Sequence, residues 1–140
     1  MRKLLSLAIV IGVLGCGGSD STAPDQAVLG DYLLTQVNGQ ATPMIYVQDI
    51  TGKVEILGGS MTLRSDHTYN QTLSVRTTRP DGTTQTSPIV ENGTFTANSQ
   101  QIIFTIPGSG SVSPLSYPAD VAGTVVTYTF QTDTYRFEKQ

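Results

Sequence analysis

The sequence predicts an all-β fold, an antiparallel up-and-down meander closed into a small barrel of about 8–10 strands. Three observations predict it. From Val28 onward, apolar and polar side chains alternate with a period of two, and no stretch has the periodicity of an amphipathic helix. Charged residues make up only 14% of the chain, and Thr occupies many of the alternate positions. The apolar runs are short and follow one another through turns rich in Gly, Asn and Asp, as neighbouring strands of one sheet do.

The composition argues against several classes of protein. One Cys in 140 residues cannot form an internal disulfide or a thiolate metal cluster. The formal charge of −3 argues against a nucleic-acid partner, which would need a basic face. The length suits one domain.

The first element along the chain is a predicted targeting segment. Arg2 and Lys3 precede an apolar run over residues 4–14. This run is shorter than the roughly 20 residues that a bilayer-spanning helix needs. We therefore predict a signal peptide over residues 1–15, cleaved before Cys16.

The residues around the predicted cleavage point add a resemblance. Val13-Leu14-Gly15-Cys16 resembles the lipobox of bacterial lipoproteins. The resemblance implies that Cys16 is acylated and holds the protein at a membrane of the bacterial cell envelope. Gly17, where Asp would signal inner-membrane retention, implies the outer membrane, with the domain facing the periplasm. The alternative is a secreted protein with a reactive free thiol.

Residues 16–27 form a predicted flexible tether, since they are rich in Gly, Ser and other small or polar residues. Cleavage removes Arg2 and Lys3 from the eight basic side chains, which leaves six against eleven acidic ones, a balance of −5. Anionic lipid repels an acidic domain. Attachment to the membrane therefore depends on the acyl chains of Cys16.

Residues 28–140 form the predicted barrel domain. Its first strand carries Leu33, Thr35 and Val37 on one face and ends at the Asn38-Gly39 turn. The later strands likewise have one apolar face, and the set is large enough to fill a small barrel. The predicted inward side chains are Val37, Met61, Leu63, Tyr69, Leu73, Val75, Ile89, Phe95, Ile102, Phe104, Val126, Tyr128, Phe130, Tyr135 and Phe137.

The turn of one hairpin fixes its register. The run RPDGT over residues 79–83 suits a type I turn followed by a left-handed Gly, which makes Arg79 and Thr83 the closing pair. Leu73 then lies opposite Ile89. A two-residue loop would shift the pairing by one and move Ile89 to the polar face, so we favour the first register.

The same register makes three further predictions. Gln71 lies opposite Glu91 on the inward face, unless a bulge at Gly93 intervenes. His67 lies opposite Phe95. Pro88 has no N–H to donate, which predicts a sheet edge or a bulge at its position.

Several segments, taken together, resemble small bacterial lipocalin-like lipoproteins. Residues 29–39 (LGDYLLTQVNG) resemble their first strand and turn. Residues 59–63 (GSMTL) with 66–69 (DHTY), then 92–95 (NGTF) and 134–139 (TYRFEK), follow in the family's order. The resemblance spans about residues 29–139 and implies a small up-and-down barrel without catalytic residues. His67 departs from the pattern, because the family usually has Gly at that turn.

Candidate chemistry lies inside the predicted barrel. No set of residues has the spacing of a metal site or a catalytic constellation. We therefore expect no enzymatic activity, no metal and no cofactor. An inward Glu91 is unfavourable unless it is paired or protonated. The candidate ligand-binding residues, as polar groups in an apolar pocket, are Gln71, Glu91, Tyr69 and Tyr128.

Two functions follow as expectations. The first is a lipid-anchored, non-enzymatic binding module for a small apolar or amphipathic ligand. The alternative is an envelope lipoprotein with a structural or protein-interaction role and a solid barrel core. It would bind an envelope protein partner through its outer face or through the loop over residues 108–118, where Leu115 and Tyr117 would form an apolar edge.

Overall fold

The computed structural model describes residues 26–140; the predicted signal peptide, Cys16 and most of the predicted tether lie outside the described residues. The described part opens with a 3-10 turn, η1 (Gln26–Val28). None of its elements is a helix long and apolar enough to cross a bilayer. The strands are β1 (Gly30–Val37), β2 (Gln40–Ala41), β3 (Met44–Asp49), β4 (Gly52–Leu63), β5 (Thr68–Thr78), β6 (Thr84–Ala97), β7 (Gln101–Ile106), β8 (Leu115–Ala122), β9 (Val125–Phe130) and β10 (Asp133–Lys139).

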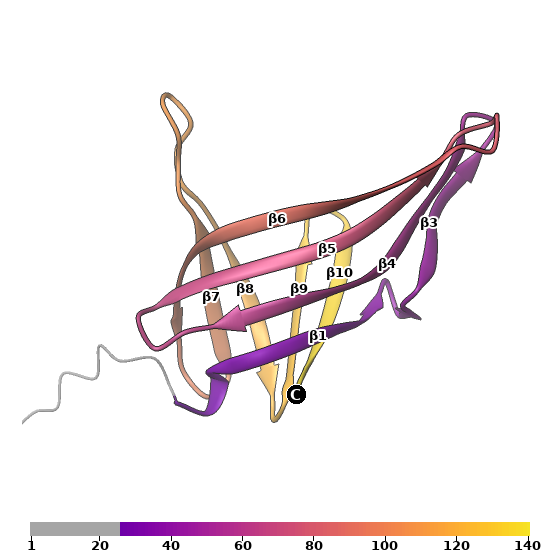
Figure 1. Cartoon of the computed structure of the whole chain (residues 1–140). Coiled ribbons are helices and arrows are strands. Elements are labelled where there is room, and N and C mark those ends of the chain that lie inside the picture. The colour runs from indigo at the N-terminus through magenta and orange to yellow at the C-terminus, as the bar shows by residue number, and fades with distance from the viewer. Residues whose placement is uncertain (1–25) are drawn as a thin grey trace, which may run out of the picture.

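Eight of these strands close into an antiparallel barrel (Figure 1). The strands β4 to β10 pair in sequence order, and β10 pairs with β1. The barrel closes where β1 pairs with β4, from Gly30 opposite Leu63 to Leu33 opposite Ser60. The other two strands are additions, since β2 pairs with β1, and β3 pairs with β4. The predicted all-β meander barrel is confirmed.

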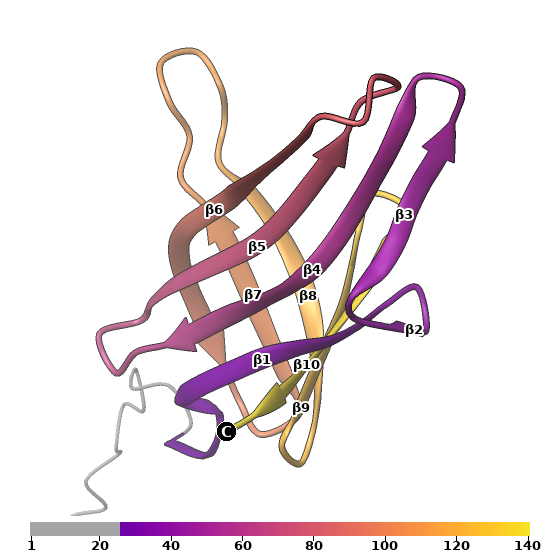
Figure 2. The same ribbon diagram turned by 45° about the vertical axis from the view of Figure 1, so that its right-hand side comes forward.

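The strands differ in length, which makes one end of the barrel uneven. β4, β5 and β6 have 12, 11 and 14 residues, whereas β7 and β9 have six. β6 pairs with β7 only over Thr94–Ala97, and its earlier residues pair with β5 alone. β3 and the neighbouring ends of β4, β5 and β6 therefore project past the barrel within the same sheet, and we call this part the extension (Figure 2). We call this end, where the β5–β6 and β9–β10 turns lie, the open end.

The chain enters the barrel at the opposite end, which we call the closed end (Figure 1). Val28 in η1 is buried there, and the Tyr32 hydroxyl donates a 2.7 Å hydrogen bond to the Val28 carbonyl oxygen. Lys139 Nζ donates to the Ala27 carbonyl oxygen at 2.8 Å. Gln26 and Ala27, assigned to the tether from the sequence, thus form a turn against the end of β10.

The β5–β6 hairpin has the predicted register. The Arg79 N–H donates to the Thr83 carbonyl oxygen at 2.8 Å, and Leu73 lies opposite Ile89. The pairing continues to Thr68 without a bulge. Pro88 lies where β6 pairs on one side only, which is the predicted sheet edge.

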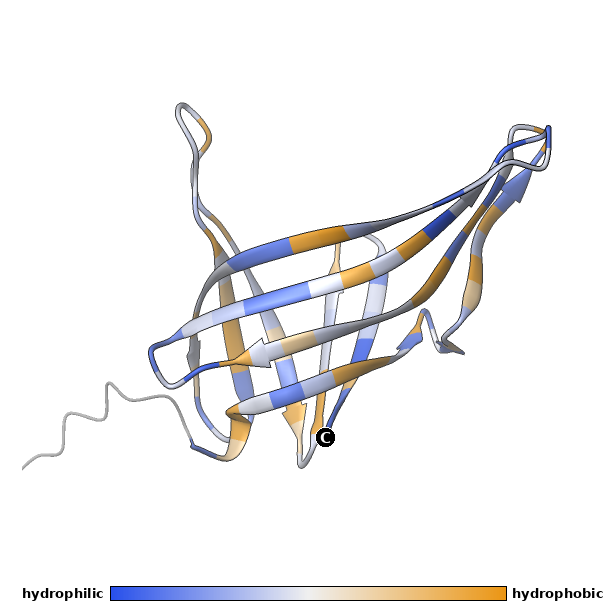
Figure 3. Cartoon of the chain, in the orientation of Figure 1, coloured by the Kyte–Doolittle hydropathy of each residue, from blue (hydrophilic) through white to orange (hydrophobic). Residues whose placement is uncertain are grey.

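Most of the predicted inward side chains are buried, and Figure 3 shows apolar and polar residues alternating along the strands. Val75, Phe130 and Tyr135 are half-buried against the core. Ile89 is 57% exposed, because its part of β6 belongs to the extension and has no neighbour in β7. Ile89 therefore lines an opening rather than the core.

The first strand corrects one prediction. The pairing of β1 with β10 shifts between Leu34 and Gln36, so Thr35 is an extra residue in a bulge. A bulge reverses the faces of the residues on either side of it. Tyr32 and Leu34 consequently point inward with Val37, while Leu33 is 46% exposed.

Candidate functional site

The inside of the barrel is filled at the closed end and hollow at the open end. Core side chains such as Val28, Phe95 and Phe104 are almost fully buried. Above them lies a pocket of about 340 Å³. Its lining consists of Tyr46, Val54, Ile56, Gln71, Leu73, Val75, Ile89, Glu91, Tyr117, Tyr128, Phe130, Gln131, Asp133 and Tyr135.

The floor of the pocket is polar. Gln71 and Glu91 are direct neighbours across β5 and β6, as the hairpin register predicts. The hydroxyls of Tyr69 and Tyr117 both donate to Glu91 Oε1, at 2.6 and 2.5 Å. The Tyr128 hydroxyl donates to Gln71 Oε1 at 2.7 Å. The structure thus brings the four predicted candidate residues together, and adds Tyr117.

The floor offers one donor group and one acceptor to the pocket. Gln71 is only 6% exposed, and no hydrogen bond within residues 26–140 uses its Nε2. Every fully buried side-chain nitrogen or oxygen among those residues has a hydrogen-bond partner. Because Nε2 has none, it is not fully buried, and it is accessible from the pocket that Gln71 lines. Glu91 Oε2 likewise has no hydrogen bond or ion pair to a described residue.

Two kinds of wall rise from this floor. The extension supplies an aliphatic wall that includes Ile56, Leu73 and Val75. β8, β9 and β10 supply an aromatic wall, in which the ring of Tyr128 lies 5.2 Å from the rings of both Tyr117 and Tyr135. Such a pocket, apolar on its sides and polar at one point, has the general form of a small-molecule site.

Burial holds the floor tyrosines in the neutral form. Desolvation raises the pKa of Tyr69, Tyr117 and Tyr128 above the ordinary tyrosine value, and the charge of Glu91 raises each pKa further. These hydroxyls therefore remain hydrogen-bond donors at neutral pH. Tyr69 supports the floor from below: its hydroxyl reaches Glu91, but the residue does not itself line the pocket. The centre of its ring lies 4.7 Å from the centre of the Phe104 ring.

Gly93 provides the space that Tyr69 occupies. The two residues are direct partners across β5 and β6. A Cβ on Gly93 would lie 2.7 Å from Tyr69 Cε1 and 2.3 Å from the Thr105 carbonyl oxygen. Only Gly at this position leaves Tyr69 in reach of Glu91.

A polar bridge crosses the mouth of the pocket. The Tyr46 hydroxyl, on β3, donates to Asp133 Oδ2 at 2.6 Å. Asn38 Nδ2 donates to Asp133 Oδ1 at 2.8 Å. The first bond joins the extension to the start of β10, and the second joins the β1–β2 turn to it. The hydrogen bond to Asp133 raises the pKa of Tyr46.

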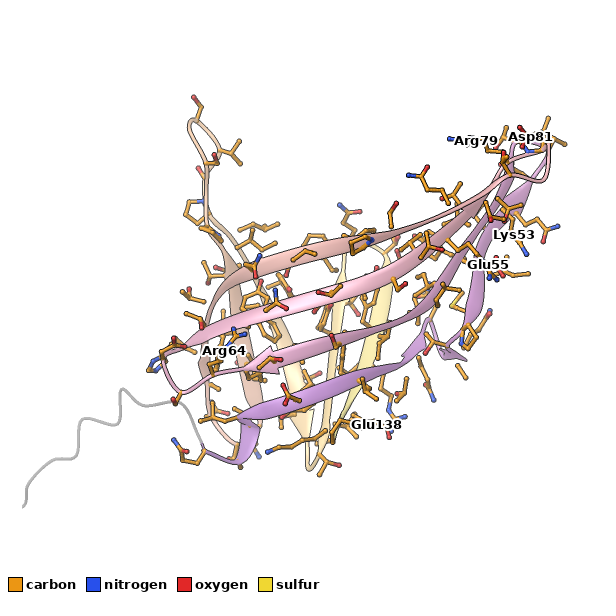
Figure 4. All side chains as sticks on the ribbon, in the orientation of Figure 1. Lys53, Glu55, Arg64, Arg79, Asp81 and Glu138 are labelled. Atoms are coloured by element: carbon orange, nitrogen blue, oxygen red, sulfur yellow. The ribbon has the colours of Figure 1, made fainter. Side chains whose placement is uncertain are left out.

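The basic side chains lie elsewhere. No Lys, Arg or His lines the pocket within the described part of the chain. Figure 4 shows Lys53 and Arg79 toward the far end of the extension and Arg64 near the β4–β5 turn. Lys53 Nζ lies 3.2 Å from Glu55. In residues 26–140, no three His, Cys, Asp or Glu side chains gather as a metal site would require.

The loop before β8 corrects a second prediction. β8 begins at Leu115, so Tyr117 belongs to a strand and lies inside the barrel instead of on an outer apolar edge. Pro114 and Pro118 suggest a loop in the sequence, but Leu115, Tyr117 and Ala119 keep the alternation of a strand. Pro118 is tolerated because it lies before the first β8–β9 pair, Ala119 with Tyr128, where β8 has a partner strand on one side only.

Comparisons with profiles of known protein families, with curated protein sequences and with solved structures gave no significant match.

Proposed function

We propose that this protein is a lipid-anchored, lipocalin-like binding module of the bacterial cell envelope that takes up a small amphipathic molecule. The observation that carries the proposal is the pocket of about 340 Å³ with a buried polar floor. A barrel whose only task is structural has no need to leave a donor and an acceptor unpaired beneath an opening. The proposal assigns no enzymatic activity and no cofactor.

The position of the N-terminal turn supports a specific arrangement at the membrane. η1 lies at the closed end, and the pocket opens at the other (Figure 2). If Cys16 is acylated, the chain leaves the membrane and reaches the closed end first. The mouth of the pocket then lies at the end of the domain opposite the point of attachment, so the anchor does not obstruct entry of the ligand.

A pair of neighbouring substitutions on β6 tests the binding function. Ile89 lines the pocket and Val90 does not, although they are 57% and 53% exposed. We expect Ile89→Trp to fill the opening and abolish binding of the neutral fluorescent probe N-phenyl-1-naphthylamine. Val90→Trp should bind it as the unsubstituted protein does. Failure of the unsubstituted protein to bind any small amphiphile, charged or neutral, would contradict the proposal.

If the protein binds no amphiphile, the alternative function is an interaction with an envelope protein. The loop between β7 and β8 projects away from the barrel at the open end, and Val112 on it is 71% exposed (Figure 1). With Tyr117 inside the barrel, Val112 and Leu115 are the large apolar side chains of this loop region that are exposed, at 71% and 49%. An interaction with an envelope protein would use these two side chains.

A further inference from the structure

The pocket carries a negative charge for which the described residues supply no counterion. Glu91 has no ion pair within residues 26–140, and Asp133 adds a second carboxylate at the rim. A partly buried carboxylate is unfavourable unless hydrogen bonds and an opposite charge compensate it. The two tyrosine hydroxyls on Oε1 supply hydrogen bonds, but no residue between 26 and 140 supplies the opposite charge.

We propose that the ligand is a cationic amphiphile, an amine with an apolar body, whose ammonium group lies at Glu91. This inference rests on the proposed function and specifies its ligand class. The ammonium would donate to Glu91 Oε2, the oxygen that no described residue uses. A charge-assisted hydrogen bond of this kind is stronger than a neutral one.

A second observation specifies the head group further. Gln71 is more than nine-tenths buried, and its unpaired amide nitrogen faces the same space as Glu91. An amide N–H donates, so it calls for an acceptor on the ligand. The head group therefore carries an oxygen close to its ammonium, as in an amino alcohol or an amino amide.

The walls suit such a molecule. The aromatic rings of Tyr117, Tyr128 and Tyr135 surround the floor on one side, and aromatic faces attract cations. The aliphatic wall opposite would hold the apolar body. An anionic amphiphile would meet Glu91 and Asp133 and no lining cation, so the pocket selects against it.

The test compares three probes of equal chain length by isothermal titration at neutral pH. They are octylamine, octanol and octanoate. We expect octylamine to bind at least about tenfold more tightly than octanol, and octanoate to bind most weakly. In Glu91→Gln, the preference for octylamine should disappear while octanol binding is kept. Glu138→Gln, on the outer face of β10, is the matched control and should keep the preference.

The outcomes separate the two proposals. Equal or tighter binding of octanol or octanoate to the unsubstituted protein overturns the cationic ligand and leaves the binding function standing. Retention of the octylamine preference in Glu91→Gln also overturns it. Absence of binding by all three probes overturns both. The ranking in the unsubstituted protein decides even if Glu91→Gln does not fold.

Discussion

At the scale of single residues, Glu91 organises its surroundings. It draws two tyrosine hydroxyls onto one carboxylate oxygen and leaves the other free. Burial raises the pKa of Tyr135, and the charges of Asp133 and then of Glu91 raise it further. A single carboxylate inside a mostly apolar barrel thus sets both the hydrogen bonding and the electrostatics of the pocket floor.

The tyrosines make stability sensitive to alkali. Each of the six has a pKa raised above its ordinary value near 10, for most mainly through burial. Above that pH the unfolded chain loses the phenolic protons and the folded chain keeps them. The stabilisation is therefore complete below about pH 10 and is lost as the pH rises further.

We expect the tyrosinate absorbance of the native protein to rise at higher pH than that of the protein unfolded in guanidinium. The chain has no Trp, so tyrosine dominates the near-ultraviolet absorbance. The native rise should coincide with loss of the β-sheet circular dichroism, because ionisation and unfolding are linked. Coincident titration curves for the native and unfolded protein would contradict this prediction.

At the scale of elements, a repeated turn explains how the hairpins are formed. Asp49, Asp66 and Asp81 each accept hydrogen bonds from the backbone N–H and hydroxyl of the Thr two residues later. Asp and Thr side chains that bond the nearby backbone replace the missing partners of a turn. The pattern D-x-T can be read directly from the sequence, and it occurs in the β3–β4, β4–β5 and β5–β6 turns.

A cross-strand ion pair holds the extension together above the barrel. Glu55 on β4 lies opposite Arg76 on β5, and the guanidinium makes two hydrogen bonds to the carboxylate at 2.8 and 3.0 Å. Hydrogen bonding and charge from Arg76, and to a smaller extent from Lys53, lower the pKa of Glu55 from 4.5 to about 2. Because the folded-state pKa is depressed, the stabilisation is complete above pH 4.5 and is lost as the pH falls through about 2.

We expect Glu55→Gln to lose less stability than the unsubstituted protein between pH 5 and pH 3. Urea unfolding at the two pH values measures this difference. Arg76→Gln removes the largest cause of the shift and should also weaken the acid dependence, but less than Glu55→Gln does, because Lys53 remains beside Glu55. Combining the two substitutions should add nothing further. A Glu55→Gln variant with the full acid dependence of the unsubstituted protein would show that the pair does not stabilise the extension.

The faces of most strands and one turn could be predicted from the sequence, whereas a bulge within β1 and the start of β8 could not. Alternation gave the inward faces of most strands, and the turn at residues 79–83 gave the Gln71–Glu91 pair. The bulge at Thr35 was not predictable, because an extra residue is recognised only against the partner strand. Tyr117 was missed because nearby prolines made its strand look like a loop, so one donor to Glu91 was absent from the predicted site.

At the scale of the whole molecule, the pocket results from unequal strand lengths. β6 pairs with β5 from Thr84 to Thr94 but with β7 only from Thr94 onward. The part of β6 before Thr94 therefore has no paired strand on its β7 side, and the barrel is open there. The sequence contains enough apolar side chains to fill a closed barrel, and composition alone therefore left the interior undecided between filled and hollow. The arrangement of strands in space decides it, since part of that apolar set lines the extension instead of the core.

The anchoring of the molecule is the prediction that concerns the whole chain. We expect fatty acid supplied in the growth medium to be incorporated into the unsubstituted protein and not into Cys16→Ser. The unsubstituted protein should fractionate with membranes, whereas Cys16→Ser should be released from them. The balance of −5 after cleavage gives the domain no electrostatic reason to bind anionic lipid, so the acyl chains alone should decide the outcome. Unlabelled protein, or Cys16→Ser retained on the membrane after high-salt washing, would contradict anchoring through Cys16. The domain would then not be held at a membrane through Cys16, although the ligand preference of its pocket would be unchanged.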